Sequence, residues 1–293
     1  MPEPTSDALP RIGVATVAYR SNHVLPTFLQ SLADATGEPF ALAVADNRPG
    51  DESAAATVTA EYEGIYLALA ENPGYGGAIN RAVAALPQTV KWVVISNPDV
   101  VFHNGSIAAL IATAEVDDRI GAVGPVVQNI DGTVYPSARA IPSVRTGIGH
   151  ALFANVWKSN PWTAAYRDGA LLSGDRRDVG WLSGSCLVVR RSAFAQIEGF
   201  DEGYFMYFED VDLGYRLGRA GWRSVYEPTA VATHTGAHST GTESATMVRA
   251  HHDSARRFLR SKYRGPLLWP LRAAFGMGLS VRAAIMTRTL HDR

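Results

Sequence analysis

A short apolar run ends abruptly in polar residues between Trp92 and Asp99. Residues 92–95 read Trp-Val-Val-Ile, which is typical of a strand buried on both faces of a parallel sheet. Pro98 cannot donate to a sheet ladder and keeps the residue before it extended, so the strand stops there. Asp99 is thus expected at the carboxyl edge of a buried strand, where open α/β sheets bind ligands. A carboxylate there suits a divalent cation and its accompanying phosphates, whereas a simple turn aspartate is the alternative.

Apolar runs alternate with helix-prone segments throughout the first half of the chain. Strands are predicted at 11–17, 40–45, 65–69, 92–95 and 121–127. The alternation predicts an α/β fold with a Rossmann-like, mostly parallel mixed sheet flanked by helices. Three predicted strands end in candidate ligands, namely Tyr19, Asp46 and Asp99. Parallel strands bring such residues to one rim of the sheet.

The segment 72–80 carries three glycines, which allow a backbone to approach a ligand closely. We expect a loop that leads into a helix. The segment resembles a phosphate loop, but it is neither the G-x-G-x-x-G motif after a first strand nor a Walker A sequence. A dinucleotide enzyme and an ATP-hydrolysing enzyme are therefore disfavoured.

Three carboxylates, Glu209, Asp210 and Asp212, directly follow the aromatic run 204–208. Like charges so close together, beside an apolar wall, raise a carboxyl pKa, so one of them could serve as a general base. The alternative is that they complement the N-terminus of a helix predicted at 209–220.

His234 follows two short predicted strands at 223–226 and 230–233. A neutral imidazole at a strand end could bind a metal, although a lone histidine is more often structural. The single cysteine, Cys186, lies in the apolar run 179–189 and excludes an internal disulfide. We interpret it as a core residue.

The C-terminal segment is basic, whereas the rest of the chain is acidic. Residues 249–293 carry a net charge of +8 and residues 1–248 a net charge of −9. Such an end suggests an anionic partner, either a membrane surface or nucleic acid.

Two helices separated at Gly265-Pro266 are predicted in this segment, with His251 and His252 as ordinary polar positions. The second helix, 267–290, is interrupted by arginines, so its apolar run is too short to span a bilayer. An amphipathic segment that lies in the headgroup region is therefore favoured. Packing on the domain or on a second subunit of a homo-oligomer is the alternative.

Over residues 11–241 the order of these motifs resembles the family 2 glycosyltransferases of the GT-A fold. Asp46 matches the aspartate that meets the nucleotide base, and segment 72–80 is similar to the nucleotide-sugar loop of rhamnosyltransferase-like members. Asn97-Pro98-Asp99 stands where the family has Asp-x-Asp. Because Asn97 replaces the first aspartate, Asp99 is expected to hold Mg²⁺ or Mn²⁺ only together with His234 and the donor diphosphate. The nucleotide-sugar donor is assigned to Tyr19, Asp46, Asn72, Gly74, Tyr75, Gly76, Asn80, Asn97 and Asp99.

The resemblance also places the catalytic base, because Glu209-Asp210 matches the family's Glu-Asp motif, whose aspartate is the base. Glu209 is kept as the second candidate. We expect Trp181, Ser183 and Gly184, together with the aromatic segment 153–166, to shape the acceptor pocket.

The resemblance implies inverting transfer of L-rhamnose from dTDP-rhamnose to polyprenyl-diphosphate-linked GlcNAc in cell-wall linker synthesis. It implies a peripheral enzyme at the cytoplasmic face of the membrane, with no nucleic acid as partner. Three alternatives stay open. The first is the same fold with UDP-galactofuranose or UDP-glucose as donor. The second is a nucleotidyltransferase, although the basic, glycine-rich signature that such an enzyme has after its first strand is absent. The third is a non-catalytic nucleotide-sugar binding protein.

The expected organisation is a mobile tail at 1–10, a catalytic domain at 11–243 and a basic helical extension at 244–293. Within the domain, 11–130 would bind the nucleotide sugar and 131–243 the acceptor.

Overall fold

The computed structural model describes residues 9–50, 54–143, 174–236 and 245–270, together with Ala273 and Met277. The predicted tail (apart from residues 9 and 10), the aromatic segment 153–166 and most of the second C-terminal helix lie outside these ranges. The strands are β1 (Ile12–Ala18), β2 (Phe40–Asp46), β3 (Ile65–Ala68), β4 (Trp92–Ser96), β5 (Val100–Phe102), β6 (Ile120–Gln128), β7 (Val134–Tyr135), β8 (Ala138–Arg139), β9 (Arg177–Val179), β10 (Trp181–Leu182), β11 (Cys186–Arg190) and β12 (Arg223–His234). The helices are α1 (Leu25–Thr36), α2 (Ala54–Glu61), α3 (Gly74–Ala85), α4 (Ser106–Glu115), α7 (Arg191–Gln196), α8 (Glu209–Arg219), α9 (Ala245–Lys262) and the 3₁₀ turn η1 (Pro266–Leu268).

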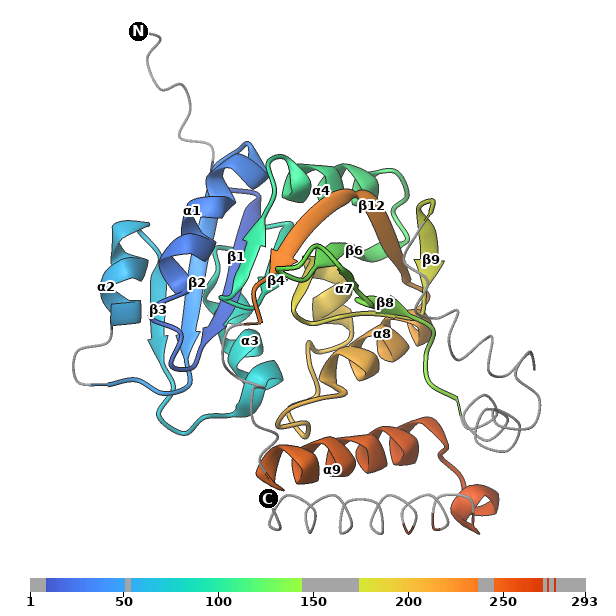
Figure 1. Cartoon of the computed structure of the whole chain (residues 1–293). Coiled ribbons are helices and arrows are strands. Elements are labelled where there is room, and N and C mark those ends of the chain that lie inside the picture. The colour runs from blue at the N-terminus through green and yellow to red at the C-terminus, as the bar shows by residue number, and fades with distance from the viewer. Residues whose placement is uncertain are drawn as a thin grey trace, which may run out of the picture.

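A mixed sheet forms the centre of the molecule (Figure 1). Its strand order is β3-β2-β1-β4-β11-β6-β12-β5, with β7 beside β6 and β9 beside β12. The first four strands are parallel to one another, which confirms the predicted Rossmann-like half. β11 runs antiparallel to both of its neighbours, β4 and β6, so a strand from the second half of the chain lies between two strands of the first.

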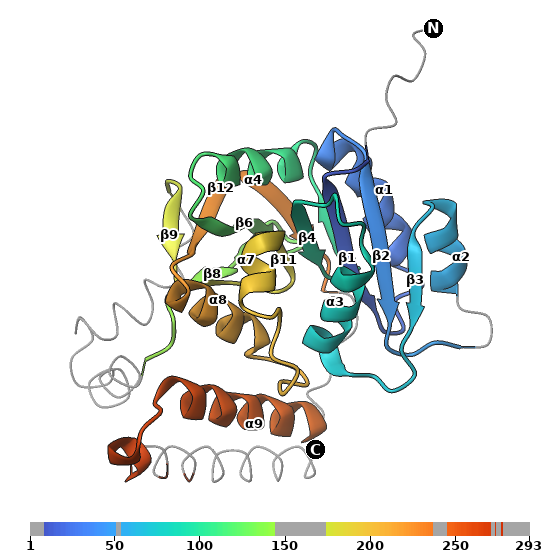
Figure 2. The ribbon, with the colours of Figure 1, turned by 180° about the vertical axis from the view of Figure 1, so that it is seen from behind.

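Both faces of the sheet are covered, and the side-chain alternation of β1 shows how. Ile12 and Val14 point into the core beneath α1 and α4, whereas Ala15 and Val17 point into the core beneath α3, α7 and α8. This is the layer arrangement expected when near-continuous apolar strands are buried on both sides. The view from behind shows α3, α7 and α8 on the near face (Figure 2).

Two local predictions are wrong. The glycine-rich segment is not a loop, because α3 already begins at Gly74. The two short strands predicted around Pro228 are one twelve-residue strand, β12, whose register against β6 shifts between Glu227 and Val231. A bulge accommodates the proline there, because the extra residues leave the ladder.

The C-terminal extension begins with α9, which lies against the segment before α8 (Figures 1 and 2). The predicted break after it is confirmed, since α9 ends at Lys262 and Gly265 has a φ of 123°. In the described ranges no helix is both long and apolar enough to cross a membrane.

Candidate active site

The carboxyl edge of the sheet brings Asp99 and His234 together. β5 pairs antiparallel with β12 so that Val100 lies opposite His234. The Oδ1 atom of Asp99 is 3.0 Å from Nε2 of His234. The carbonyl of Asp99 also accepts hydrogen bonds from the backbone N–H and the hydroxyl of Thr235, at 2.9 and 3.0 Å. The predicted pairing of these two residues is therefore present.

This pair offers a carboxylate oxygen and an imidazole nitrogen, a donor set that suits Mg²⁺ or Mn²⁺. Within the described ranges no third His, Cys, Asp or Glu joins them. A bound cation would therefore have to complete its shell with water and with oxygens of a ligand. Asn97 stands where the first aspartate of an Asp-x-Asp motif would be, so the protein offers the cation one carboxylate fewer.

Asp210 is held at the start of α8 by two backbone groups. Its Oδ2 accepts the N–H of Gly184 at 3.0 Å, and its Oδ1 accepts the N–H of Val211 at 2.8 Å. Burial raises the pKa of Asp210, although these two hydrogen bonds oppose the rise. The carboxylate is thus oriented by the 183–185 turn, on the face that Asp99 also borders.

Glu209, the neighbouring carboxylate, is only 8% exposed, and its Oε2 has no hydrogen-bond partner among the described residues. Burial, and secondarily the charge of Asp210, raise the pKa of Glu209 to about 8. The buried surroundings thus raise the pKa of both carboxyls, and the N–H groups of Gly184 and Val211 favour the charged form of Asp210. The preference for Asp210 over Glu209 as the base stays a prediction.

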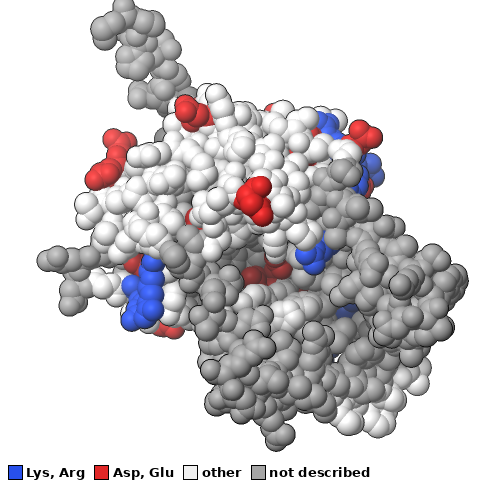
Figure 3. Space-filling view, viewed as in Figure 1, with Lys and Arg blue, Asp and Glu red and all other residues white. Residues whose placement is uncertain are grey.

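Tyr75 connects the two halves of the site. Its hydroxyl donates to the carbonyl of Gly184, the residue whose N–H binds Asp210. Burial raises the pKa of Tyr75 well above its ordinary value, and the charges of Glu209, Asp210 and Asp99 add to the rise. Tyr75 thus lies near all three carboxylates. Figure 3 shows acidic surface within a hollow near the middle of this face.

Three further predicted donor ligands lie at the ends of neighbouring strands. Asp46, at the end of β2, is 3% exposed and accepts hydrogen bonds from the hydroxyl of Tyr66 and the N–H of Arg48. Tyr19 follows β1 and is 49% exposed. Asn97 follows β4, and its backbone N–H binds the carbonyl of Ser185. All three reach the predicted rim, and their contact with a donor stays a prediction.

Gly74 and Gly76 of α3 lie close to another part of the protein, and their contact with a donor stays a prediction. A Cβ at Gly74 would lie 2.3 Å from the carbonyl oxygen of Phe205, and one at Gly76 would lie 2.8 Å from Cβ of Phe200. The backbone N–H of Tyr75 also binds the Phe205 carbonyl. These positions therefore allow α3 to approach the segment that precedes α8.

Asn72 and Asn80 are likewise occupied within the protein. Asn72 accepts the N–H of Gly74 with its side-chain oxygen. The amide of Asn80 bonds both the N–H and the carbonyl of Phe200, each at 2.9 Å. Both side chains thus position backbone groups, and their assignment to donor binding stays a prediction.

Of the predicted acceptor residues, Gly184 is the one that hydrogen-bonds to Asp210. The indole of Trp181 donates to the carbonyl of Ala140. Ser183 is buried, and its hydroxyl lies 3.0 Å from that of Ser185. Trp181 and Ser183 thus support the turn that carries Gly184, and their place in the acceptor pocket stays a prediction.

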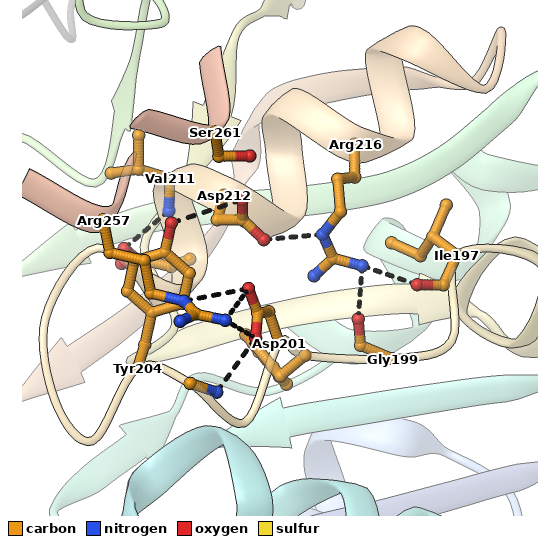
Figure 4. A network of polar contacts seen from close by, with 12 residues as sticks. Ile197, Gly199, Asp201, Tyr204, Val211, Asp212, Arg216, Arg257 and Ser261 are labelled. Carbon is orange, nitrogen blue, oxygen red and sulfur yellow. Dashed lines mark hydrogen bonds and ion pairs between the residues drawn. The ribbon is translucent and has the colours of Figure 1, made fainter. Parts of the chain in front are cut away.

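Asp212, the third carboxylate of the cluster, is structural. It accepts a 2.6 Å hydrogen bond from Nε of Arg216, whose Nη1 binds the carbonyls of Ile197 and Gly199 (Figure 4). The sequence motif therefore divides into two residues at the site and one that anchors α8 to the preceding turn.

Sequence reasoning missed two features next to the site. Tyr207 and Phe208 have φ values of 68° and 65°, although neither is a glycine. His251 of α9 packs edge-on against both rings, with centroids 5.4 Å apart in each case. The run 204–208, which is aromatic except for Met206, was the signal of this packing in the sequence.

The comparisons with known proteins agree with this geometry. The family model described as "Glycosyltransferase like family 2" matches residues 10–253. The chain is 46% identical to the N-acetylglucosaminyl-diphospho-decaprenol L-rhamnosyltransferase of two Mycobacterium tuberculosis strains, over 97% of this chain and 94% of that protein. It is 26% identical to rhamnosyltransferase WbbL of Escherichia coli K12, over 85% of this chain and 92% of that protein.

Among solved structures, the fold is similar to that of the mannosyltransferase PcManGT from Pyrobaculum calidifontis in complex with GDP-Man and Mn²⁺. The TM-score is 0.58 at 14% identity, covering 98% of this chain and 74% of that one. The likeness confirms the predicted GT-A fold. A family match over most of the chain and a 46% identical relative of nearly equal length lead to one conclusion: this chain is a member of glycosyltransferase family 2.

Proposed function

We propose that this protein is an inverting, metal-dependent rhamnosyltransferase. It transfers L-rhamnose from dTDP-rhamnose to N-acetylglucosaminyl-diphospho-polyprenol. The observation that carries the proposal is the 46% identity to the mycobacterial enzyme of that class along nearly the whole of both chains. The paired Asp99 and His234 and the oriented Asp210 supply the groups that such a reaction needs.

The donor end of the site is the rim of the parallel strands. Asp99 and His234 would hold Mg²⁺ or Mn²⁺, and a divalent cation at this position neutralises the charge of a leaving nucleoside diphosphate. Asp46, at the end of the next strand but one, is assigned to the nucleoside. The positioning of the donor diphosphate between these residues accounts for much of the expected rate, because it holds the reacting atoms in line.

The acceptor end of the site is centred on Asp210. Its carboxylate removes the proton of the acceptor hydroxyl as the oxygen attacks the anomeric carbon. The N–H of Gly184 fixes the orientation of that carboxylate, and Tyr75 fixes Gly184 in turn. The attack from the face opposite the leaving group inverts the anomeric configuration.

Transfer itself tests the proposal. Purified protein with Mg²⁺ or Mn²⁺ is incubated with dTDP-rhamnose and a short synthetic polyprenyl-diphosphate-GlcNAc, and the product is identified by mass spectrometry. A gain of one deoxyhexose is expected, and it should be absent for Asp210→Asn. Parallel reactions with UDP-glucose and UDP-galactofuranose decide between donors, and preferred transfer from either would overturn the assignment of rhamnose.

We further propose a peripheral contact with the cytoplasmic face of the membrane, where a polyprenyl acceptor resides. Arg260 and Arg264 are exposed, and the turn that follows exposes Leu267 at 92% and Trp269 at 63%. Basic residues beside exposed apolar and indole side chains suit an anionic lipid surface. Co-sedimentation with vesicles containing phosphatidylglycerol is expected, with a marked loss in Leu267→Ala/Trp269→Ala. Equal sedimentation of the two proteins would rule out this surface.

A further inference from the structure

The residues directly before the catalytic pair adopt an unusual backbone. Tyr207 and Phe208 are consecutive and both left-handed, with φ values of 68° and 65°. Bulky side chains rarely adopt this conformation, because the Cβ atom approaches the backbone carbonyl. Phe208 is also the residue that caps α8, and its carbonyl accepts the N–H of Asp212 at 2.9 Å. Surrounding contacts must hold this turn, and the turn sets the direction in which Glu209 and Asp210 leave it.

α9 supplies many of those contacts from one face. His251 packs against both left-handed rings, and Phe258 packs against Phe208 at a centroid distance of 5.8 Å. Ser254 is 5% exposed and donates its hydroxyl to the carbonyl of Met206 at 2.8 Å. These positions follow the helical spacing of three and four residues, so a single stripe of α9 covers the segment 206–208.

A neighbouring ion pair adds a second attachment. The guanidinium of Arg257 bonds both carboxylate oxygens of Asp201, at 2.7 and 3.1 Å, and lies 5.2 Å from the ring centre of Tyr204 (Figure 4). The pair is partly exposed, so it contributes less to stability than the buried contacts do. It nevertheless connects α9 to Asp201, which precedes residues 206–208 in the stretch between α7 and α8.

The opposite side of this segment contacts the donor half of the site. The carbonyl of Phe205 accepts the N–H of Tyr75, and Phe200 is bonded at both backbone groups by Asn80. Residues 200–208 thus lie between α3 and α9. Any shift of α9 relative to α3 would move the turn that aims Asp210.

We propose that α9 is a positioning element of the active site, in which His251 and Ser254 hold residues 206–208 in the left-handed turn that orients Asp210. The inference rests on the proposed role of Asp210 as the base. It differs from the membrane contact, which concerns the exposed residues after α9. Under this proposal the C-terminal extension acts on catalysis directly, whether or not it also binds lipid.

The test compares full-length variants of α9. His251→Ala removes the ring that packs edge-on against Tyr207 and Phe208, whereas His251→Phe keeps an aromatic ring there. Arg249→Ala, an exposed change on the same helix, is the matched control. We expect His251→Ala to lower kcat about tenfold with the KM for donor unchanged, because misplacing a catalytic group costs rate rather than donor binding. His251→Phe should retain most of the rate and Arg249→Ala all of it.

Hydrogen–deuterium exchange provides a readout that needs no substrate. Amides of residues 204–212 should exchange faster in His251→Ala, with little change in β1 to β4. This outcome stands even if the donor or acceptor proves to be another molecule, so it separates this inference from the proposed function. Unchanged exchange at 204–212 together with a wild-type kcat would overturn the positioning role.

A rescue experiment isolates the backbone conformation itself. Glycine adopts a positive φ without steric cost. Tyr207→Gly in the His251→Ala background should therefore recover part of the lost kcat, several-fold above His251→Ala alone. If the double variant shows no recovery while remaining folded, the left-handed turn is not what α9 maintains and the inference fails.

Discussion

The carboxylate of Asp99 and the imidazole of His234 lie 3.0 Å apart, although 135 residues separate them in the chain. β5 and β12 create this contact, because their antiparallel register places Val100 opposite His234. The pair supplies two protein ligands, which is fewer than an all-protein site for a divalent cation would have. Metal and nucleotide are therefore expected to bind together rather than independently.

This coupling predicts the behaviour of ligand-site variants. Asp99→Asn and His234→Ala should each weaken dTDP binding at least tenfold in the presence of Mn²⁺. In both variants the addition of EDTA should then make little further difference. Calorimetric titration of dTDP with Mn²⁺ or with EDTA measures both effects. Wild-type protein that binds dTDP equally well with EDTA would contradict the metal site.

The two aspartates of α8 should respond differently to the same change. Asp210→Asn is expected to lower kcat by about 10² to 10⁴, the usual contribution of a general base, with the thermal midpoint little changed. Asp212→Asn should instead destabilise the fold by about 3 kcal/mol, because it breaks the buried pair with Arg216. Activity per folded molecule and thermal melts distinguish them. The assignment of the base would not survive a near-wild-type kcat in folded Asp210→Asn.

Removal of one hydroxyl tests the connection through Gly184. Tyr75→Phe leaves the Gly184 carbonyl without its donor, an omission that costs about 1–3 kcal/mol. We expect a lower thermal midpoint and a kcat reduced about tenfold, as Asp210 loses its oriented N–H. Tyr62→Phe, which alters a ring packed on the other face of the sheet, is the control and should change neither quantity. Equal behaviour of the two variants would show that the hydroxyl does not orient the base.

The raised pKa of Glu209 predicts a pH-dependent stability. The folded protein holds this proton up to about pH 8, whereas the unfolded chain releases it near its ordinary value of 4.5. Between these values the folded state binds more protons, so stability falls as pH rises through this window. Glu209→Gln should therefore melt at the wild-type temperature near pH 4 and a few degrees higher at pH 8.5. Melts of ligand-free protein across this range check the prediction, and a difference that shrinks as pH rises would contradict it.

Two glycine-to-alanine changes should have opposite signs. Gly74 has a φ of 80° and no room for a Cβ against the Phe205 carbonyl, so Gly74→Ala should cost more than about 2 kcal/mol. Gly218 lies in α8 with ordinary φ and open space around it, so Gly218→Ala should stabilise by about 0.5–1 kcal/mol. Denaturant titration gives both values. A tolerated Gly74→Ala would show that α3 can move away from the 200–205 segment.

The fold was accessible from sequence because it rests on periodic patterns. Apolar strands alternating with helices predict a parallel sheet, and a strand that stops at Pro98 predicts where Asp99 lies. The antiparallel insertion of β11 was not predictable, because its apolar run is equally compatible with several places in a sheet. Likewise the continuity of β12 depends on a bulge that local propensities at Pro228 do not reveal.

The candidate reactive groups could be singled out from the sequence, whereas the residues that support them could not. Asp99, Asp210 and His234 carry chemistry that stands out in the sequence. Asn80 and Ser183 are equally suited to ligand binding and to backbone hydrogen bonds, and only three-dimensional contacts show that they make the latter. His251 looked ordinary because its partners, Tyr207 and Phe208, are more than 40 residues away and act through a tertiary contact.

The position of β11 affects how the protein folds during its synthesis on the ribosome. Ser96 of β4 binds the carbonyl of Ser185, which is 89 residues later. At ordinary synthesis rates of about 5–20 residues per second, β4 waits roughly 5–20 s for its neighbour. During that interval β4, whose residues 92–95 are all apolar, has an unpaired edge, and such an edge favours pairing between nascent chains. We therefore expect heterologous expression to yield more soluble protein at low temperature with co-expressed chaperones, and truncations before residue 190 to aggregate.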